Sequence, residues 1–102
     1  MNPRARFFAT FINAVFYYFE VRKKSLFDPI DKVARRYWTE IGKLKTKEAR
    51  YINQIGYERF KRLIKWAAKP HHVQELIKIV NTKGEIIAGE YLFQHAKKHH
   101  II

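Results

Sequence analysis

Residues 7–21 of the chain, FFATFINAVFYYFEV, contain seven aromatic side chains in fifteen positions. The whole protein has 102 residues with 8 Phe, 6 Tyr and 2 Trp, so this one stretch holds almost half of the aromatic side chains. As a helix it would be apolar on nearly every side, and helices of that kind are buried. The segment therefore needs a core, a membrane interface or a larger assembly around it.

The chain as a whole is strongly basic. Lys and Arg total 21 against 9 Asp and Glu, which gives a net charge of +12 and a pI of about 10.1. Such a balance indicates an acidic partner: nucleic acid, an anionic lipid surface or acidic neighbours in a complex. The chain has no cysteine, which excludes a disulfide framework, a thiol nucleophile and a zinc ribbon.

The aromatic segment is too short for an unambiguous membrane span. Its fifteen residues would extend about 22 Å as a helix, whereas the hydrocarbon core of a bilayer is about 30 Å thick. The alternatives are a central core helix of the chain's own bundle and an interfacial or subunit-contacting helix anchored by Arg4, Arg6 and Arg22–Lys24. We favour the contact helix, because seven aromatic rings have more apolar surface than so small a bundle is expected to bury. The residues expected at that contact are Phe7, Phe8, Phe11, Phe16, Tyr17, Tyr18 and Phe19.

The apolar spacing predicts an all-α fold with about four helices in a single domain over residues 1–102. Asn2-Pro3 and Asp28-Pro29 are typical helix starts, because the polar side chain caps the first turn and Pro fits its geometry. The expected helices cover about 3–25, 29–44, 46–69 and 71–99, with linkers at 25–28 and 43–47. We expect them to be extended or loosely bundled and completed by partner subunits, because so short a chain is marginal alone.

Two small residues mark a contact on the last expected helix. Gly84 and Ala88 stand four positions apart on one face, and such a pair lets another helix approach closely. The sequence therefore predicts a helix–helix contact at Gly84 and Ala88.

No set of residues predicts catalysis, and we expect no enzyme activity and no cofactor. Glu85 and Glu90 would diverge by more than about 100° on a helix, whereas acid–base catalysis needs groups that converge on one substrate. His95 and His99 share a helix face, as metal ligands do. No third ligand stands at a fixed distance on that face, so we interpret the pair as a solvated C-terminal turn and expect no metal site.

Basic and aromatic residues are interleaved over two stretches, 35–38 (RRYW) and 57–66. They could form a nucleic-acid surface, with cations on phosphates and aromatic rings on unpaired bases. They could also be the rim of a core, and the place of Trp38 on an apolar stripe favours that interpretation. An anionic membrane would attract the same cations. The cations expected to face an anionic lipid or an acidic partner are Arg22, Lys23, Lys24, Arg35 and Arg36.

The N-terminal half resembles subunit g of the mitochondrial F-type ATP synthase. The run Phe16-Tyr17-Tyr18 is followed by Val21, a short gap, Pro29-Ile30 and an amphipathic helix. That family has a Tyr-Tyr segment, a proline-containing break and an amphipathic helix in the same order.

The C-terminus is similar to that family's GEIIG-containing tail in either of two registers. Residues 84–88, GEIIA, match its letters, although Gly89 and Glu90 then stand where the family has a basic pair. Alternatively, Lys97-Lys98 and Ile101-Ile102 match the end of the tail, without its final Gly-Tyr. The two registers exclude each other.

The resemblance implies a non-catalytic accessory subunit of the ATP synthase membrane region, beside subunit e, that supports dimerisation and the shape of the cristae. It implies a place at the mitochondrial inner membrane, on the matrix-facing side; an anionic lipid such as cardiolipin is a further expected partner. The alternative function is a small basic ribosomal or mitoribosomal protein that binds rRNA. A third possibility, a free helical bundle, predicts a cooperatively melting monomer. We expect aggregation of the isolated chain instead, because apolar surface would lack a partner.

Overall fold

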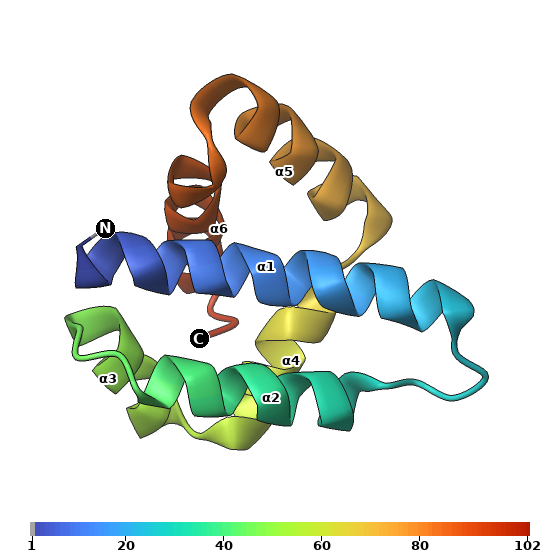
Figure 1. The fold of residues 1–102 in the computed structure, drawn as a ribbon, viewed down its shortest axis with the longest axis horizontal. Helices are drawn as coiled ribbons and strands as arrows, with labels where there is room; N and C mark the ends of the chain where they lie inside the picture. Colours follow the sequence, from blue (N-terminus) through green and yellow to red (C-terminus); the bar gives the residue numbers. More distant parts are fainter. Residues whose placement is uncertain (1) are drawn as a thin grey trace.

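The aromatic segment lies in the longest helix, α1 (Pro3–Lys24), which runs through the centre of the molecule (Figure 1). The computed structural model describes residues 2–102. Helix α1 begins where the sequence predicts, because the Asn2 side chain accepts a hydrogen bond from the Ala5 N–H and Pro3 takes the first helical position. It ends before Ser25, whose hydroxyl donates to the Val21 carbonyl oxygen.

Five further helices complete the described part of the chain, residues 2–102, and no strand occurs in it. They are α2 (Ile30–Gly42), α3 (Lys47–Ile55), α4 (Tyr57–Ala67), α5 (Pro70–Lys83) and α6 (Glu85–Lys98). The all-α prediction is confirmed. The prediction of four helices is wrong, because each of the two long helices expected after residue 46 is divided in two.

The two divisions occur at Gly56 and Gly84. Both residues have a φ near +90° with an extended ψ, at 92° and 165° for the first and 91° and 167° for the second. This conformation favours glycine, which has no Cβ to clash. The new helix then carries an acidic residue in its first turn, Glu58 or Glu85, where the helix dipole favours it. The apolar spacing does not predict either junction, because Gly56 and Gly84 each fall on the apolar stripe of an expected helix.

The other helices pack around α1. It lies mainly against α6 and α2, and to a smaller extent against α4 and α3, whereas α5 packs mainly on α6. In Figure 1, α5 lies above α1 and α2 lies below it, whereas α6 crosses behind α1, so that the C-terminus emerges below. The radius of gyration is 12.6 Å, close to the value of about 13 Å for a compact domain of 100 residues. The prediction of an extended or loosely bundled arrangement is therefore wrong.

The aromatic side chains of α1 form much of the core. Phe7, Phe8 and Phe11 have no exposed surface. Their rings meet the Phe93 ring of α6 edge to face, at centroid distances of 5.5, 6.0 and 6.2 Å, which is a favoured geometry for aromatic pairs. Tyr18, two turns further along, is also fully buried. The chain's own helices thus enclose much of the segment for which the sequence analysis expected an outside partner.

Candidate binding surface

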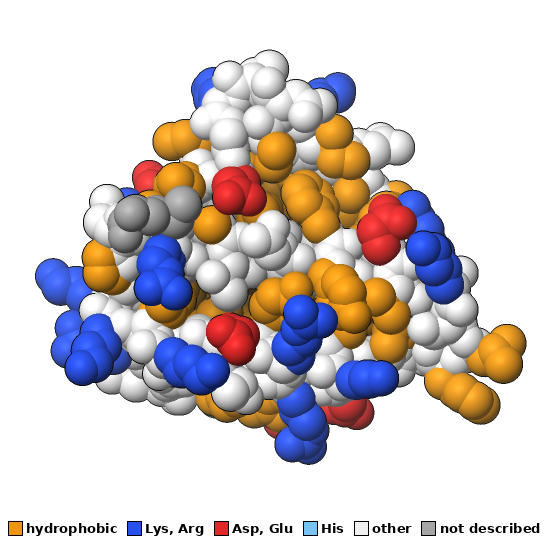
Figure 2. Space-filling model, viewed as in Figure 1, with side chains coloured by type: hydrophobic (Ala, Val, Ile, Leu, Met, Phe, Trp, Pro, Cys, Tyr) orange, Lys and Arg blue, Asp and Glu red, His pale blue; other side chains and the backbone are white. Residues whose placement is uncertain are grey.

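The loop between α1 and α2 carries the two most exposed large apolar side chains of residues 2–102. Leu26 is 97% exposed and Phe27 is 86% exposed, and we call this pair the apolar tip. Its loop projects from the right-hand end of Figure 1, and Figure 2 shows apolar side chains protruding at the same end. Burying a Leu or Phe side chain is worth about 1.5–3 kcal/mol. An apolar pair exposed at the apex of a loop is therefore a candidate contact surface.

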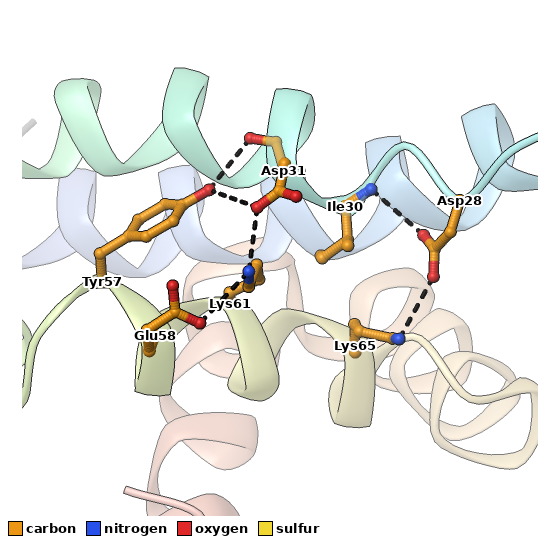
Figure 3. A network of polar contacts seen from close by, with 7 residues as sticks. All are labelled: Asp28, Ile30, Asp31, Tyr57, Glu58, Lys61 and Lys65. Atoms are coloured by element: carbon orange, nitrogen blue, oxygen red, sulfur yellow. Dashed lines mark hydrogen bonds and ion pairs between the residues drawn. The ribbon is translucent and has the colours of Figure 1, made fainter.

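The base of this loop is held by Asp28. Its carboxylate accepts hydrogen bonds from the Tyr18 hydroxyl (2.6 Å) and the Ile30 N–H (3.1 Å). It also pairs with the Lys65 ammonium of α4 at 3.2 Å, as Figure 3 shows. Burial alone would raise the pKa of Asp28, but these partners outweigh it and lower that pKa. The ionised carboxylate thus ties the loop base to α1 and α4 while the apolar tip projects.

A second polar network joins α2 to α4 (Figure 3). The Lys61 ammonium lies 2.9 Å from the Asp31 carboxylate and 3.2 Å from the Glu58 carboxylate. The Tyr57 hydroxyl donates between the Asp31 carbonyl and carboxylate oxygens, at 3.1 and 3.3 Å. The hydrogen bond and charge of Lys61 lower the pKa of Asp31. Lys61 and Lys65 are therefore engaged inside the chain and not part of a free basic face on α4.

Three cations, Arg22, Lys23 and Lys24, occupy the last turn of α1 directly before the exposed loop; we call them the basic cluster. Within residues 2–102, Arg22 and Lys24 form no ion pair, and Lys23 pairs with Glu20 at 3.5 Å. The Lys23 ammonium also lies 4.0 Å from the centroid of the Phe19 ring, a cation–π contact. Cations beside an exposed apolar pair suit a surface that is anionic outside and apolar inside.

The other two cations expected at a contact, Arg35 and Arg36, point to different helices. The Arg35 guanidinium lies 5.2 Å from the ring centroid of Tyr57 on α4. The Arg36 guanidinium lies 5.0 Å from the Tyr17 ring on α1 and 5.4 Å from the Tyr37 ring. It lines a surface groove of about 600 Å³ between α1 and α2. The two neighbours in sequence thus belong to different parts of the surface.

Three of the seven aromatic residues expected at a membrane or subunit contact reach the surface. Tyr17 is 40% exposed, and Phe16 and Phe19 are partly buried against the core. The other four, Phe7, Phe8, Phe11 and Tyr18, are fully buried. Within residues 2–102, no helix combines the length and the apolar character needed to cross a bilayer.

The two small residues expected at a helix–helix contact lie in different settings. Gly84 is at the exposed junction of α5 and α6, with nothing within 4 Å of the place a Cβ would take. Ala88 is buried on α6. The close approach of α6 to α1 is at the next residue, Gly89, where a Cβ would lie 2.9 Å from the Phe8 Cβ. The four-residue spacing did not indicate Gly89.

Four of the five histidines gather beside Trp66, a cluster that the sequence analysis missed. The Trp66 ring lies 4.4 Å from the His72 ring and 5.6 Å from the His95 ring, centroid to centroid. His71 and His99 extend the cluster, at 4.1 Å from His72 and 4.4 Å from His95. Within residues 2–102, no three potential ligands are placed to hold a metal ion. The turn between α5 and α6 brings the start of α5 beside the end of α6. Without that turn, the sequence could not indicate that these histidines lie together.

Comparison with known proteins adds no relative. The chain matches no family model, no curated protein and no solved structure. The resemblance to ATP synthase subunit g therefore has only the quoted residues as its support, and it stays a prediction.

Proposed function

We propose that the protein is a non-catalytic accessory component that attaches to an anionic membrane surface through the apolar tip and the basic cluster. The observation that carries this proposal is the exposure of Leu26 and Phe27 one residue beyond Arg22–Lys24. The tip supplies apolar side chains for the headgroup region, and the cluster supplies charge for lipid phosphates. The compact core supports a peripheral attachment, in which a folded domain rests on the membrane.

The expected strength is that of a reversible attachment. Burial of the two tip side chains contributes about 3–6 kcal/mol. Three cations near an anionic surface contribute about 3 kcal/mol in total. Stable anchoring of peripheral proteins usually needs two signals, such as an apolar insertion and a basic patch. Binding should therefore require both the apolar tip and anionic lipid.

A narrower form of the proposal places the protein on the matrix-facing side of the mitochondrial inner membrane. There it would be an ATP synthase accessory subunit beside a subunit e-like neighbour, with cardiolipin as the anionic lipid. Its support is the sequence resemblance, which includes the exposed Tyr17. Co-purification from native membranes followed by mass spectrometry tests it. Recovery with ATP synthase subunits would support it, and recovery with ribosomal proteins would contradict it.

A second candidate function is the binding of ribosomal RNA, which the number of free cations favours. Within residues 2–102, only five of the 21 Lys and Arg side chains form ion pairs: Arg4, Lys23, Lys43, Lys61 and Lys65. The others are available to neutralise phosphates. Protein held by RNA phosphates should be released steeply as the salt concentration rises. Protein held on a membrane by the apolar tip should be released only by detergent.

Co-sedimentation with lipid vesicles tests the membrane proposal. We expect the protein to bind vesicles that contain phosphatidylglycerol and not vesicles of pure phosphatidylcholine, because the basic cluster needs anionic lipid. Replacing both tip residues, Leu26→Ser with Phe27→Ser, should weaken binding at least about tenfold, because a loss of 1.4 kcal/mol is already tenfold.

The matched control is Ile77→Ser with Ile87→Ser. These two side chains are each 46% exposed, on α5 and α6, so the control removes exposed apolar surface elsewhere on the molecule. It should bind vesicles as the wild type does. Equal losses in the two double variants would contradict a specific role of the tip. Binding to an RNA oligonucleotide with no binding to vesicles would favour the second candidate function.

A further inference from the structure

A groove lies beside the basic cluster, between the last turns of α1 and the junction of α4 and α5. Its volume is about 400 Å³, and its lining residues are Phe19, Arg22, Lys23, Ala68 and Pro70. This volume is within the range of about 300–1,000 Å³ that is typical of small-molecule sites. Since Arg22 and Lys23 precede the apolar tip by only a few residues, the groove lies near the part of the molecule proposed to face the membrane.

The walls of the groove suit an apolar ligand. Phe19 contributes part of an aromatic ring, and Ala68 and Pro70 contribute aliphatic surface. The Ala68 N–H is already bonded to the Ile64 carbonyl oxygen at 3.1 Å, and Pro70 has no N–H to offer. These wall residues therefore present no free backbone donor that a polar ligand would need.

The cations of the groove suit a phosphate. The Arg22 guanidinium forms no ion pair within residues 2–102, and its planar fork of donors matches the geometry of a phosphodiester. Lys23 adds a second charge, and its contact with the Phe19 ring holds it on the apolar wall. Its partner Glu20 is exposed and 3.5 Å away, so a stronger anion can replace that contact.

We propose that this groove binds one molecule of an anionic phospholipid, with an acyl chain against Phe19, Ala68 and Pro70 and the phosphate on Arg22 and Lys23. The inference rests on the proposed membrane attachment and specifies its partner: the apolar tip enters the bilayer without discrimination, and the groove selects one lipid. Charge complementarity with apolar walls favours a phospholipid over a free phosphate, which would use the cations and leave the walls in water.

A water-soluble, short-chain phosphatidylglycerol, used below its micelle concentration, tests the groove apart from any bilayer. In a ¹H–¹⁵N NMR titration we expect saturable shifts at Phe19, Arg22 and Ala68. Glycerol phosphate, which has the charge without the chains, and short-chain phosphatidylcholine, which has the chains without the net charge, should each bind at least tenfold more weakly. Equal binding of glycerol phosphate would overturn the acyl-chain site.

Variants separate the groove from the apolar tip. Ala68→Phe fills the groove and Arg22→Gln removes the phosphate partner, so each should weaken short-chain lipid binding at least tenfold. If Ala68→Phe does not fold, Arg22→Gln alone tests the groove. Lys78→Gln, an exposed cation on α5, is the matched control. The tip double variant should keep short-chain binding while it loses vesicle binding.

The two proposals fail in different ways. Vesicle binding by the wild type with no saturable shifts from short-chain phosphatidylglycerol would overturn the groove and leave the membrane attachment intact. Failure of vesicle binding in the wild type would overturn the attachment, whatever the short-chain lipid does.

Discussion

Gly89 determines how closely α6 approaches α1. A Cβ at this position would lie 2.9 Å from the Phe8 Cβ and would also collide with the Phe8 carbonyl oxygen. Phe8 can move little, because its ring is fully buried and packs against Phe93. Interiors are packed at the density of organic crystals, so an added methyl group must displace backbone here.

Gly89→Ala should therefore lower the free energy of unfolding by about 1–3 kcal/mol, the usual cost of overpacking a core. Urea unfolding followed by far-UV circular dichroism measures it. Gly42→Ala is the matched control: nothing lies within 4 Å of its added Cβ, and Ala is the better helix former by up to about 1 kcal/mol. A Gly89→Ala variant as stable as the wild type would show that α1 and α6 do not need this approach.

Among the helices, α5 is the one whose packing should depend on pH. It packs mainly on α6, and His72 in its first turn donates a hydrogen bond from Nδ1 to the Trp66 carbonyl oxygen at 2.8 Å. Burial lowers the pKa of His72 below 6.5; nearby cations add to this effect and the hydrogen bond to Trp66 opposes it. The titratable groups around His72 are Lys69, His71, Glu75, Tyr91 and His95.

The protein should lose stability as the pH falls below about 6.5. A histidine with a lowered pKa in the folded state binds its proton more readily in the unfolded chain, so its contribution is complete above the unfolded pKa and is lost as the pH falls toward the folded one. Thermal unfolding at pH 7.5 and pH 5.5 measures the loss. His72→Gln should reduce the difference in Tm between the two pH values, whereas His100→Gln, exposed near the C-terminus, should not. An unchanged difference in His72→Gln would contradict the role of this histidine.

The helix ends show what the sequence could and could not predict. Asn2-Pro3 and Pro70 mark boundaries by their chemistry, and the structure begins helices at Pro3 and Pro70. Gly56 and Gly84 were missed, because a positive φ leaves no trace in apolar periodicity. The histidine cluster was missed for the same reason. In one long helix over 71–99, its first and last turns would lie far apart, whereas the turn at Gly84 brings the start of α5 beside the end of α6.

At the scale of the whole molecule, the sequence suggested a fold that partners complete, and the structure shows a compact core in which the chain's own helices enclose much of the aromatic segment. From the sequence, we expected that one small bundle could not bury all seven aromatic rings of residues 7–21. Four of them are fully buried, three of these around Phe93. The position of Phe93 opposite α1 depends on the turn between α5 and α6, so no local pattern could predict it. The exposure of Leu26 and Phe27 also depends on tertiary structure, because two apolar residues in a linker can fold inward or outward.

A compact core enclosed by several helices at once has a direct consequence: we expect the isolated chain to unfold as one cooperative unit. Burial of Phe7, Phe8, Phe11 and Tyr18 depends on α1 packing on α2, α4 and α6 at once, so losing one contact exposes the others. Far-UV circular dichroism and the fluorescence of Trp38 and Trp66 should give coincident transitions at neutral pH, as two-state unfolding requires.

Trp38 packs between α2 and α4 against Phe60, whereas Trp66 lies beside His72 and His95 of α5 and α6, so the two probes report on different parts of the core. Variants that keep only one Trp separate the signals of the two residues.

Any association of the isolated chain should come from the apolar tip. The double variant Leu26→Ser with Phe27→Ser should therefore be monomeric in light scattering, with a Tm no lower than that of the wild type. A gradual transition, or two transitions at different urea concentrations, would mean that the core needs a partner after all.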